Sequence, residues 1–122
     1  MPPPGADRHG EANIAVALQI TFRKMPPSPY VRGRIKERVD KLARFCDRIL
    51  GCRAVVEAPH RHHHKGKLYL VAVEVKLPGA TVTSHRNPGQ RHEHADVYVA
   101  LRDAFDAIER QIQDYMRRKG AA

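Results

Sequence analysis

The 122-residue sequence has no tryptophan, only two cysteines and an aromatic content of 6%. Because unpaired bases usually stack on aromatic side chains, this scarcity argues against base stacking as the main mode of binding to a nucleic acid. Cys46 and Cys52 are too few for a disulfide scaffold, and we interpret both as reduced, partly buried thiols. No apolar run approaches the roughly 18 residues that a membrane-spanning helix needs. We therefore expect a cytoplasmic protein that does not contact a membrane.

The sequence also lacks the motifs of common catalytic sites. It contains no glycine-rich phosphate loop, no nucleophile elbow and no H-E-x-x-H or C-x-x-C metal motif. Cys46 with a histidine is the one nucleophile–base pair worth considering, and its position beside the apolar face of a helix favours core packing. We predict that the protein is not an enzyme and uses no cofactor.

Positive charge is abundant, with 22 lysines and arginines against 13 aspartates and glutamates, a formal net charge of +9. A domain this basic usually binds a polyanion: nucleic acid, an anionic membrane or an acidic protein. Residues 1–13 have neither a secretory apolar segment nor a periodic pattern, so we predict a disordered, proline-rich leader there. Residues 14–120 are expected to form a single binding domain.

Two hydrophobic periods alternate along this domain. A period of two indicates half-buried strands, and spacings of three or four indicate amphipathic helices. Ser28 is suited to cap the first helix, with Pro29 in its first turn and Gly51 at or just beyond its end. Asp96 is suited to cap the second. The predicted elements are a strand over 14–22, a helix over 29–50, strands over 52–58, 67–77 and 80–86, and a helix over 97–119.

This order, strand-helix-strand-strand-strand-helix, predicts an α+β fold. The first strand-helix-strand unit should be a right-handed crossover between parallel strands, and the later strands can join through hairpins such as one at Pro78 and Gly79. Because each helix has a single apolar face, both should cover the same face of a four-stranded mixed sheet. The resulting two-layer sandwich resembles a double-stranded-RNA-binding domain with an extra strand in front.

Basic residues cluster beside the apolar stripe of the first helix. Residues 32–48 hold seven basic and three acidic side chains, and Arg34, Arg38 and Lys41 fall on one flank of the stripe. Such a band would line the groove between the helices and present cations to phosphates. The alternative is a solvated face whose charges confer only solubility. The phosphate-binding interpretation predicts that reversing Arg38 and Lys41 to glutamate weakens RNA binding with little change in stability.

The second helix carries five basic and five acidic residues. Its cations concentrate late, where they also suit the negative end of the helix dipole, so helix stabilisation is an alternative to RNA binding. These late cations are Arg110, Arg117, Arg118 and Lys119. Three aspartates are expected to face solvent and to repel phosphate from the outer side of this helix: Asp103, Asp106 and Asp114.

The densest cationic cluster is HRHHHKGK at residues 60–67, in a loop predicted between two strands. Its lysines and arginine provide fixed charge at one end of the sheet. Imidazole is the commonest metal ligand and the chain has eight histidines, so a metal site is an alternative. Adjacent histidines in a loop rarely converge on one ion, however, and we predict no metal site.

Two stretches, VVEAPHRHHHKGKLY and DVYVALRDAFDAIERQI, are specific beyond their composition. Together with ITFRKMPPSPYVRGRIKERVDKLARFCDRILG, they resemble the bacterial ribosome hibernation-promoting factor family. That family is also called ribosome-associated inhibitor A, and earlier sigma-54 modulation protein. The resemblance covers about residues 14–120 and implies the same order of strands and helices as the periodicity, in one ribosome-binding domain.

The resemblance also implies a function. It implies binding to the small ribosomal subunit in the mRNA and tRNA channel near the decoding centre, which inhibits translation and preserves idle ribosomes under stress or in stationary phase. Ribosomal RNA is the implied partner, with no small-molecule substrate. The residues that the resemblance assigns to RNA binding are Arg23, Lys24, Arg34, Arg38, Lys41, Arg61, His62, His63, Lys65, Lys67, Arg86, Arg110, Arg117, Arg118 and Lys119.

Long members of the family carry a further C-terminal domain that pairs ribosomes. This sequence stops at Ala122, so we expect a short-type member without a built-in ribosome-dimerisation domain. Two other functions stay open at this point. One is a general module for structured RNA, and the other, less favoured, is a histidine-rich metal-binding protein.

Overall fold

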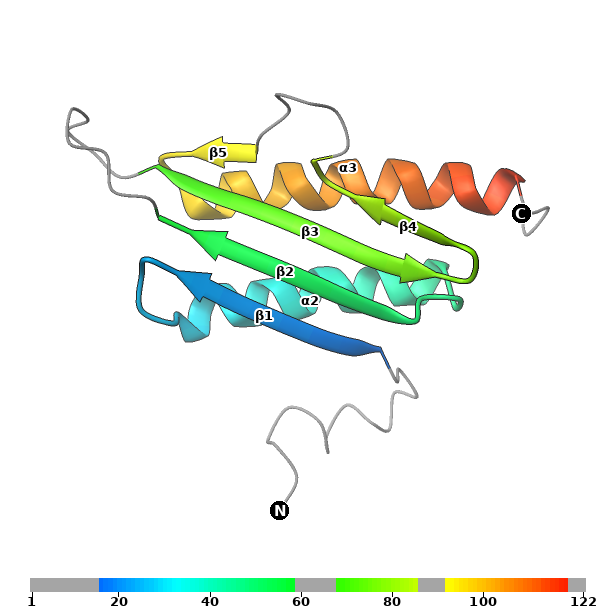
Figure 1. Ribbon diagram of the computed structural model, residues 1–122, viewed down its shortest axis with the longest axis horizontal. Helices are drawn as coiled ribbons and strands as arrows, with labels where there is room; N and C mark the ends of the chain where they lie inside the picture. Colours follow the sequence, from blue (N-terminus) through cyan, green and yellow to red (C-terminus); the bar gives the residue numbers. More distant parts are fainter. Residues whose placement is uncertain (1–15, 59–67, 86–91, 119–122) are drawn as a thin grey trace, which may run out of the picture.

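The structure is a computed structural model that describes residues 16–58, 68–85 and 92–118 (Figure 1). The predicted leader, residues 1–13, and the whole predicted histidine-rich loop, residues 60–67, lie outside the described residues. The described elements are β1 (Ala17–Arg23), α2 (Pro29–Phe45), β2 (Gly51–Glu57), β3 (Tyr69–Leu77), β4 (Ala80–Thr83), β5 (His92–His94) and α3 (Val97–Arg118).

Four strands form the body of the sheet, in the order β1-β2-β3-β4. β1 runs parallel to β2, with Ile20 opposite Ala54, and β2 runs antiparallel to β3, with Ala54 opposite Val73. Pro78 and Gly79 form the turn into β4, where Gly79 has a φ of 75° that a residue without Cβ adopts at little cost. The predicted mixed sheet and its hairpin turn are confirmed.

A fifth strand, β5, was not predicted. It pairs antiparallel with the first half of β3, where Tyr69 lies opposite His94. β4 pairs with the second half of β3, so the two short strands share that edge of the sheet. The described sheet therefore has five strands where four were expected, and the fold class is unchanged. A three-residue strand is too short to show a hydrophobic period.

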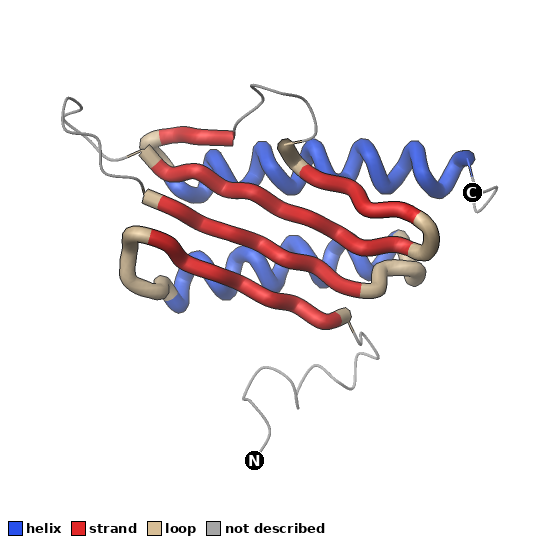
Figure 2. Tube along the Cα trace, viewed as in Figure 1, coloured by secondary structure: helices blue, strands red, loops and turns tan. Residues whose placement is uncertain are grey.

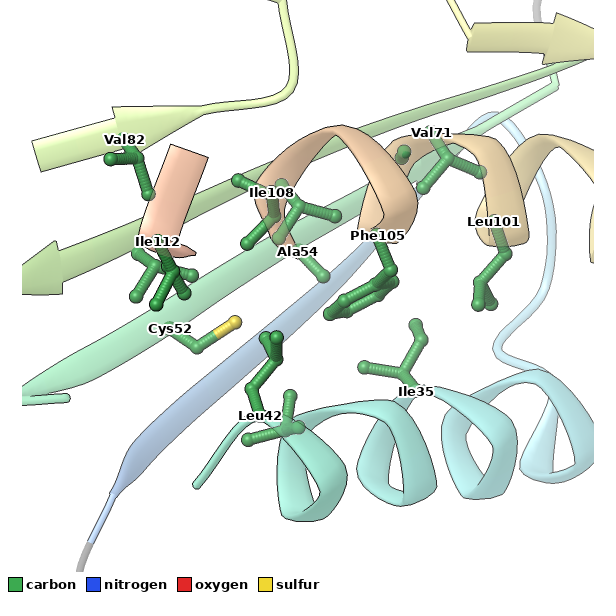
Figure 3. Close-up of a cluster of buried hydrophobic side chains, with 14 of the residues drawn as sticks. Ile35, Leu42, Cys52, Ala54, Val71, Val82, Leu101, Phe105, Ile108 and Ile112 are labelled. Atoms are coloured by element: carbon green, nitrogen blue, oxygen red, sulfur yellow. The ribbon is translucent and has the colours of Figure 1, made fainter. Parts of the chain in front are cut away.

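Both helices cover the same face of the sheet (Figures 1 and 2). Figure 3 shows their apolar side chains directed at the strands and at one another. Ile35 and Leu42 of α2 and Phe105 and Ile108 of α3 are each at most 1% exposed, as is Ala54 of β2. Burial of this single layer of side chains holds the helices on the sheet. The predicted two-layer sandwich is confirmed.

The helix α2 begins where the sequence predicts, but it ends earlier. Ser28 Oγ accepts a hydrogen bond from the Val31 amide at 3.2 Å, which confirms the predicted cap. Cys46 then adopts an extended conformation and ends the helix five residues before Gly51, where β2 starts. The chain needs the intervening residues to reverse direction between α2 and β2. Ile49 is still buried, because the connecting segment passes over the same core.

The helix α3 begins and ends close to the prediction. Asp96 Oδ1 accepts a hydrogen bond from the Tyr98 amide at 2.9 Å, so Asp96 caps the helix as expected. With 22 residues, α3 is the longer of the two helices, and one face of it is charged along its length. Across the described ranges, no helix combines the length and the apolar character that crossing a membrane requires.

Candidate nucleic-acid interface

The helices α2 and α3 run in the same direction, so that both begin at one end of the molecule (Figure 1). This end also receives the last residues of β1 and β2 and the first residues of β3. Between the first halves of the helices lies a hollow of about 320 Å³. Its lining residues are Arg34, Arg38, Tyr98, Val99, Leu101 and Arg102. We call this hollow the N-terminal hollow; Tyr30, four residues before Arg34 on α2, is exposed and is not one of its lining residues.

Further along the groove, Arg38 of α2 is committed to contacts with α3. Its Nη2 lies 2.9 Å from Asp106 Oδ1 and 3.5 Å from Glu109 Oε2. Its guanidinium carbon also lies 5.5 Å from the centre of the Phe105 ring, and only 15% of the side chain is exposed. Arg38 is therefore in the groove, as predicted, but its charge is already compensated within the fold.

Lys41 belongs to the same ion-pair network. Its Nζ lies 3.4 Å from Glu109 Oε2, although more than half of the side chain remains in solvent. The expectation that Asp106 faces away into solvent is wrong, because the flank of α3 that carries Asp106 and Glu109 packs against α2. Two cations and two carboxylates balance here, so a phosphate must compete with internal partners at mid-groove.

The N-terminal hollow presents its cations differently. Arg34 extends its guanidinium over the ring of Tyr98, 5.2 Å from the ring centre, and 53% of its side chain is exposed. Its ion pair with Glu37, at 3.5 Å, is between two exposed side chains and so contributes little. Arg102 is also exposed, and its one ion pair within the described part of the chain is with its neighbour Asp103. Positive charge is therefore accessible at this end of the groove.

Three residues of this end were not predicted from the sequence: Tyr30, Tyr98 and Arg102. Tyr30 stands four residues before Arg34, and Tyr98 stands four residues before Arg102. Residues at this spacing share one face of a helix, so each helix carries an aromatic ring and an arginine side by side. The spacing was the available signal, but it does not reveal that Arg34 of α2 lies over the ring of Tyr98 of α3.

Arg23 is the last residue of β1, and Lys24 follows it at the same end of the molecule (Figure 1). Both are exposed, and Lys24 Nζ lies 3.6 Å from Glu57 Oε2 at the end of β2. Lys24 has a φ of 58°, a left-handed conformation that is uncommon for a residue with a side chain. This turn conformation brings the chain from β1 round to α2.

The last residues of α3, Arg117 and Arg118, lie at the opposite end of the molecule (Figure 1). Arg110, Arg117 and Arg118 are exposed, and Arg117 pairs with Asp114 one turn earlier. The eight described residues from the predicted set therefore divide into three groups: those at the N-terminal end of the helices, Arg38 and Lys41 in the ion-pair network, and the three arginines in the second half of α3. Their role in RNA binding stays a prediction. The other predicted residues lie outside the described part: Arg61, His62, His63, Lys65, Lys67, Arg86 and Lys119.

Neither thiol is placed to act as a nucleophile. Cys46 and Cys52 are both buried, in agreement with the sequence interpretation, and they form no disulfide. Burial raises the pKa of the Cys52 thiol to about 12, because the interior disfavours the thiolate. Among the described side chains, no group of three or more histidines, cysteines or carboxylates could hold a metal ion. The histidine-rich loop itself lies outside them.

Comparison with known proteins identifies the family. The model of the family described as sigma 54 modulation protein / S30EA ribosomal protein matches residues 18–119, which include every described strand and helix apart from the first residue of β1. The chain belongs to this family. The resemblance inferred from the sequence is thereby confirmed.

One curated relative is the ribosome hibernation promotion factor of Deinococcus radiodurans, 24% identical over 100 residues. The match covers 82% of this chain and 49% of the relative, so the chain spans about half the relative's length. A ribosomal subunit interface protein from Coxiella burnetii has a similar structure, with a TM-score of 0.67 at 20% identity, covering 84% of this chain and 99% of that one. The N-terminal domain of Thermus thermophilus Protein Y is also similar, with a TM-score of 0.65 at 22% identity, covering 82% of this chain and 99% of that one. These two likenesses support the fold.

Proposed function

We propose that this protein is a ribosome hibernation factor of the cytoplasm. It binds the small ribosomal subunit in the mRNA and tRNA channel near the decoding centre, inhibits translation and preserves idle ribosomes under stress or in stationary phase. The observation that carries the proposal is the family match over residues 18–119. The name of the Deinococcus radiodurans relative and the exposed cations at both ends of the helical layer support it.

The mode of binding is electrostatic. Arg34 and Arg102 at the N-terminal hollow and Arg110 and Arg118 on α3 are exposed cations that ribosomal phosphates can neutralise. Each phosphate contact releases counterions, so binding weakens steeply with salt. With roughly 6 phosphate contacts, affinity should fall about 10³-fold between 50 and 200 mM salt.

Binding to purified ribosomal subunits tests the proposal. We expect co-sedimentation with small subunits at low salt, little with large subunits, and inhibition of translation of a reporter mRNA in a reconstituted system. Arg34→Glu combined with Arg102→Glu should weaken both effects. Arg53→Glu is the matched control, since Arg53 is equally exposed but lies on β2 and pairs with Glu74 on β3.

Two outcomes would overturn the proposal. One is absence of the protein from the small-subunit fraction at low salt. The other is equal displacement by a short RNA duplex and by intact small subunits, which would indicate a general module for structured RNA instead.

A further inference from the structure

The N-terminal hollow has an unusual composition for this chain. Across the described residues, the large hydrophobic side chains that are exposed are Tyr30, Leu50 and Tyr98. The two tyrosines lie at the N-terminal ends of α2 and α3, and Tyr30 is 80% exposed. Tyr98 is 37% exposed. In a sequence with so few aromatic residues, an exposed ring at the start of each helix is better explained by contact with a ligand than by packing.

These rings and the arginines beside them form an alternating arrangement. The guanidinium carbon of Arg34 lies 5.2 Å from the centre of the Tyr98 ring, and 53% of the Arg34 side chain is exposed. Tyr30 lies one helical turn before Arg34 on the same face of α2. A guanidinium plane and an aromatic ring are the two kinds of side-chain surface on which unpaired bases stack. Arg102, on the other wall, supplies charge for a phosphate.

We propose that the N-terminal hollow binds one unpaired RNA base, which stacks on the outer face of Arg34 with Tyr30 as its second wall, while Arg102 contacts the adjoining phosphate. This inference rests on the proposed function and names what one part of that surface recognises. The scarcity of aromatic residues excludes an extended stacking platform, but it does not exclude a single stacked base among phosphate contacts.

A stacked base has a signature that phosphate contacts lack. Stacking is insensitive to salt, whereas each phosphate contact adds to the salt dependence. Loss of the Tyr30 ring should therefore reduce affinity by about tenfold at every salt concentration. Loss of the Arg102 charge should reduce affinity and also flatten the salt dependence.

The test uses the full chain, a short single-stranded RNA that carries one 2-aminopurine, and small subunits. We expect the wild type and Tyr30→Phe to quench the 2-aminopurine fluorescence and Tyr30→Ala to quench it much less. The wild type should bind an RNA of the same length with an abasic ribose at that position about tenfold more weakly than it binds the base-bearing RNA. The wild type and Tyr30→Ala should bind the abasic RNA with equal affinity. Tyr30 is mostly in solvent, so its replacement should not disturb the fold, which circular dichroism checks.

The outcomes separate this inference from the proposed function. If Tyr30→Ala binds the RNA and the small subunit as tightly as the wild type, the base site is refuted while the ribosomal function stands. If the base is quenched in a Tyr30-dependent way but small subunits are not bound, the base site stands and the ribosomal function fails. Equal affinity of the wild type for the abasic and base-bearing RNA would also overturn the base site.

Discussion

Replacing Arg38 with alanine should destabilise the protein substantially, although Arg38 was predicted as an RNA ligand. Its Nη2 donates a charged hydrogen bond of 2.9 Å to Asp106, and such bonds contribute about 1.5–3 kcal/mol. Stacking on Phe105 adds about 0.5–1 kcal/mol. Removal also leaves the mostly buried Glu109 with Lys41 as its remaining cation.

Two observations reduce this estimate. Asp106 is about half exposed, so solvent screens its attraction to Arg38. Arg38 Nε and Glu109 Oε2 are buried without hydrogen-bond partners among the described residues, a cost that the native state already carries. We therefore expect Arg38→Ala to lower the free energy of unfolding by about 2 kcal/mol, or roughly 10 °C in the midpoint of thermal unfolding for a domain of this size.

Urea unfolding followed by far-ultraviolet circular dichroism measures this loss. Arg34→Ala is the control, because an exposed ion pair should contribute less than about 0.5 kcal/mol. A double-mutant cycle between Arg38→Ala and Asp106→Ala should give a coupling of about 1 kcal/mol. A loss below about 0.5 kcal/mol for Arg38→Ala would refute the structural role and restore the view of Arg38 as a free cation.

Two further predictions follow from the core and the sheet. Because burial raises the pKa of the Cys52 thiol from 9.0 to about 12, this thiol should not react with iodoacetamide at pH 8 in the folded protein, and rapid labelling would contradict the prediction. Above pH 9, Cys52 ionises in the unfolded chain but not in the folded protein. The stability difference between the wild type and Cys52→Ala should therefore shrink as the pH rises toward 12. Ser84, just after β4, accepts a hydrogen bond through its Oγ from the Val73 amide at 2.9 Å. Ser84→Ala should therefore lower the free energy of unfolding in urea by about 1–3 kcal/mol. An unchanged midpoint of urea unfolding would show that another acceptor replaces the hydroxyl.

The fold was largely predictable because its signals are local. Alternating apolar residues mark β1 and β3, and the caps at Ser28 and Asp96 mark where both helices begin. The end of α2 was not predictable, because Ile49 continues the helical spacing after the helix has ended and is buried from the segment that connects α2 to β2. β5 was missed because pairing with β3, not its own composition, makes it a strand.

The candidate site was less predictable, because it depends on contacts between distant residues. Helical spacing placed Arg34, Arg38 and Lys41 beside the seam, and the structure agrees. It could not show that Asp106, 68 positions after Arg38, lies opposite it and compensates its charge. For the same reason, the meeting of Arg34 with Tyr98 was invisible in a sequence with few aromatic residues.

The position of β1 at the edge of the sheet allows this strand to open locally. Among the described strands, β1 pairs with β2 alone, whereas β2 and β3 each have neighbours on both sides, so the first residues of β1 can open without breaking the pairing of β2 with β3. Opening from Ala17 begins at the end of the sheet opposite the N-terminal hollow (Figure 1). A fluorophore attached ahead of β1 can therefore fray this strand without disturbing the hollow, which makes that end the natural place to label the protein when its binding is measured.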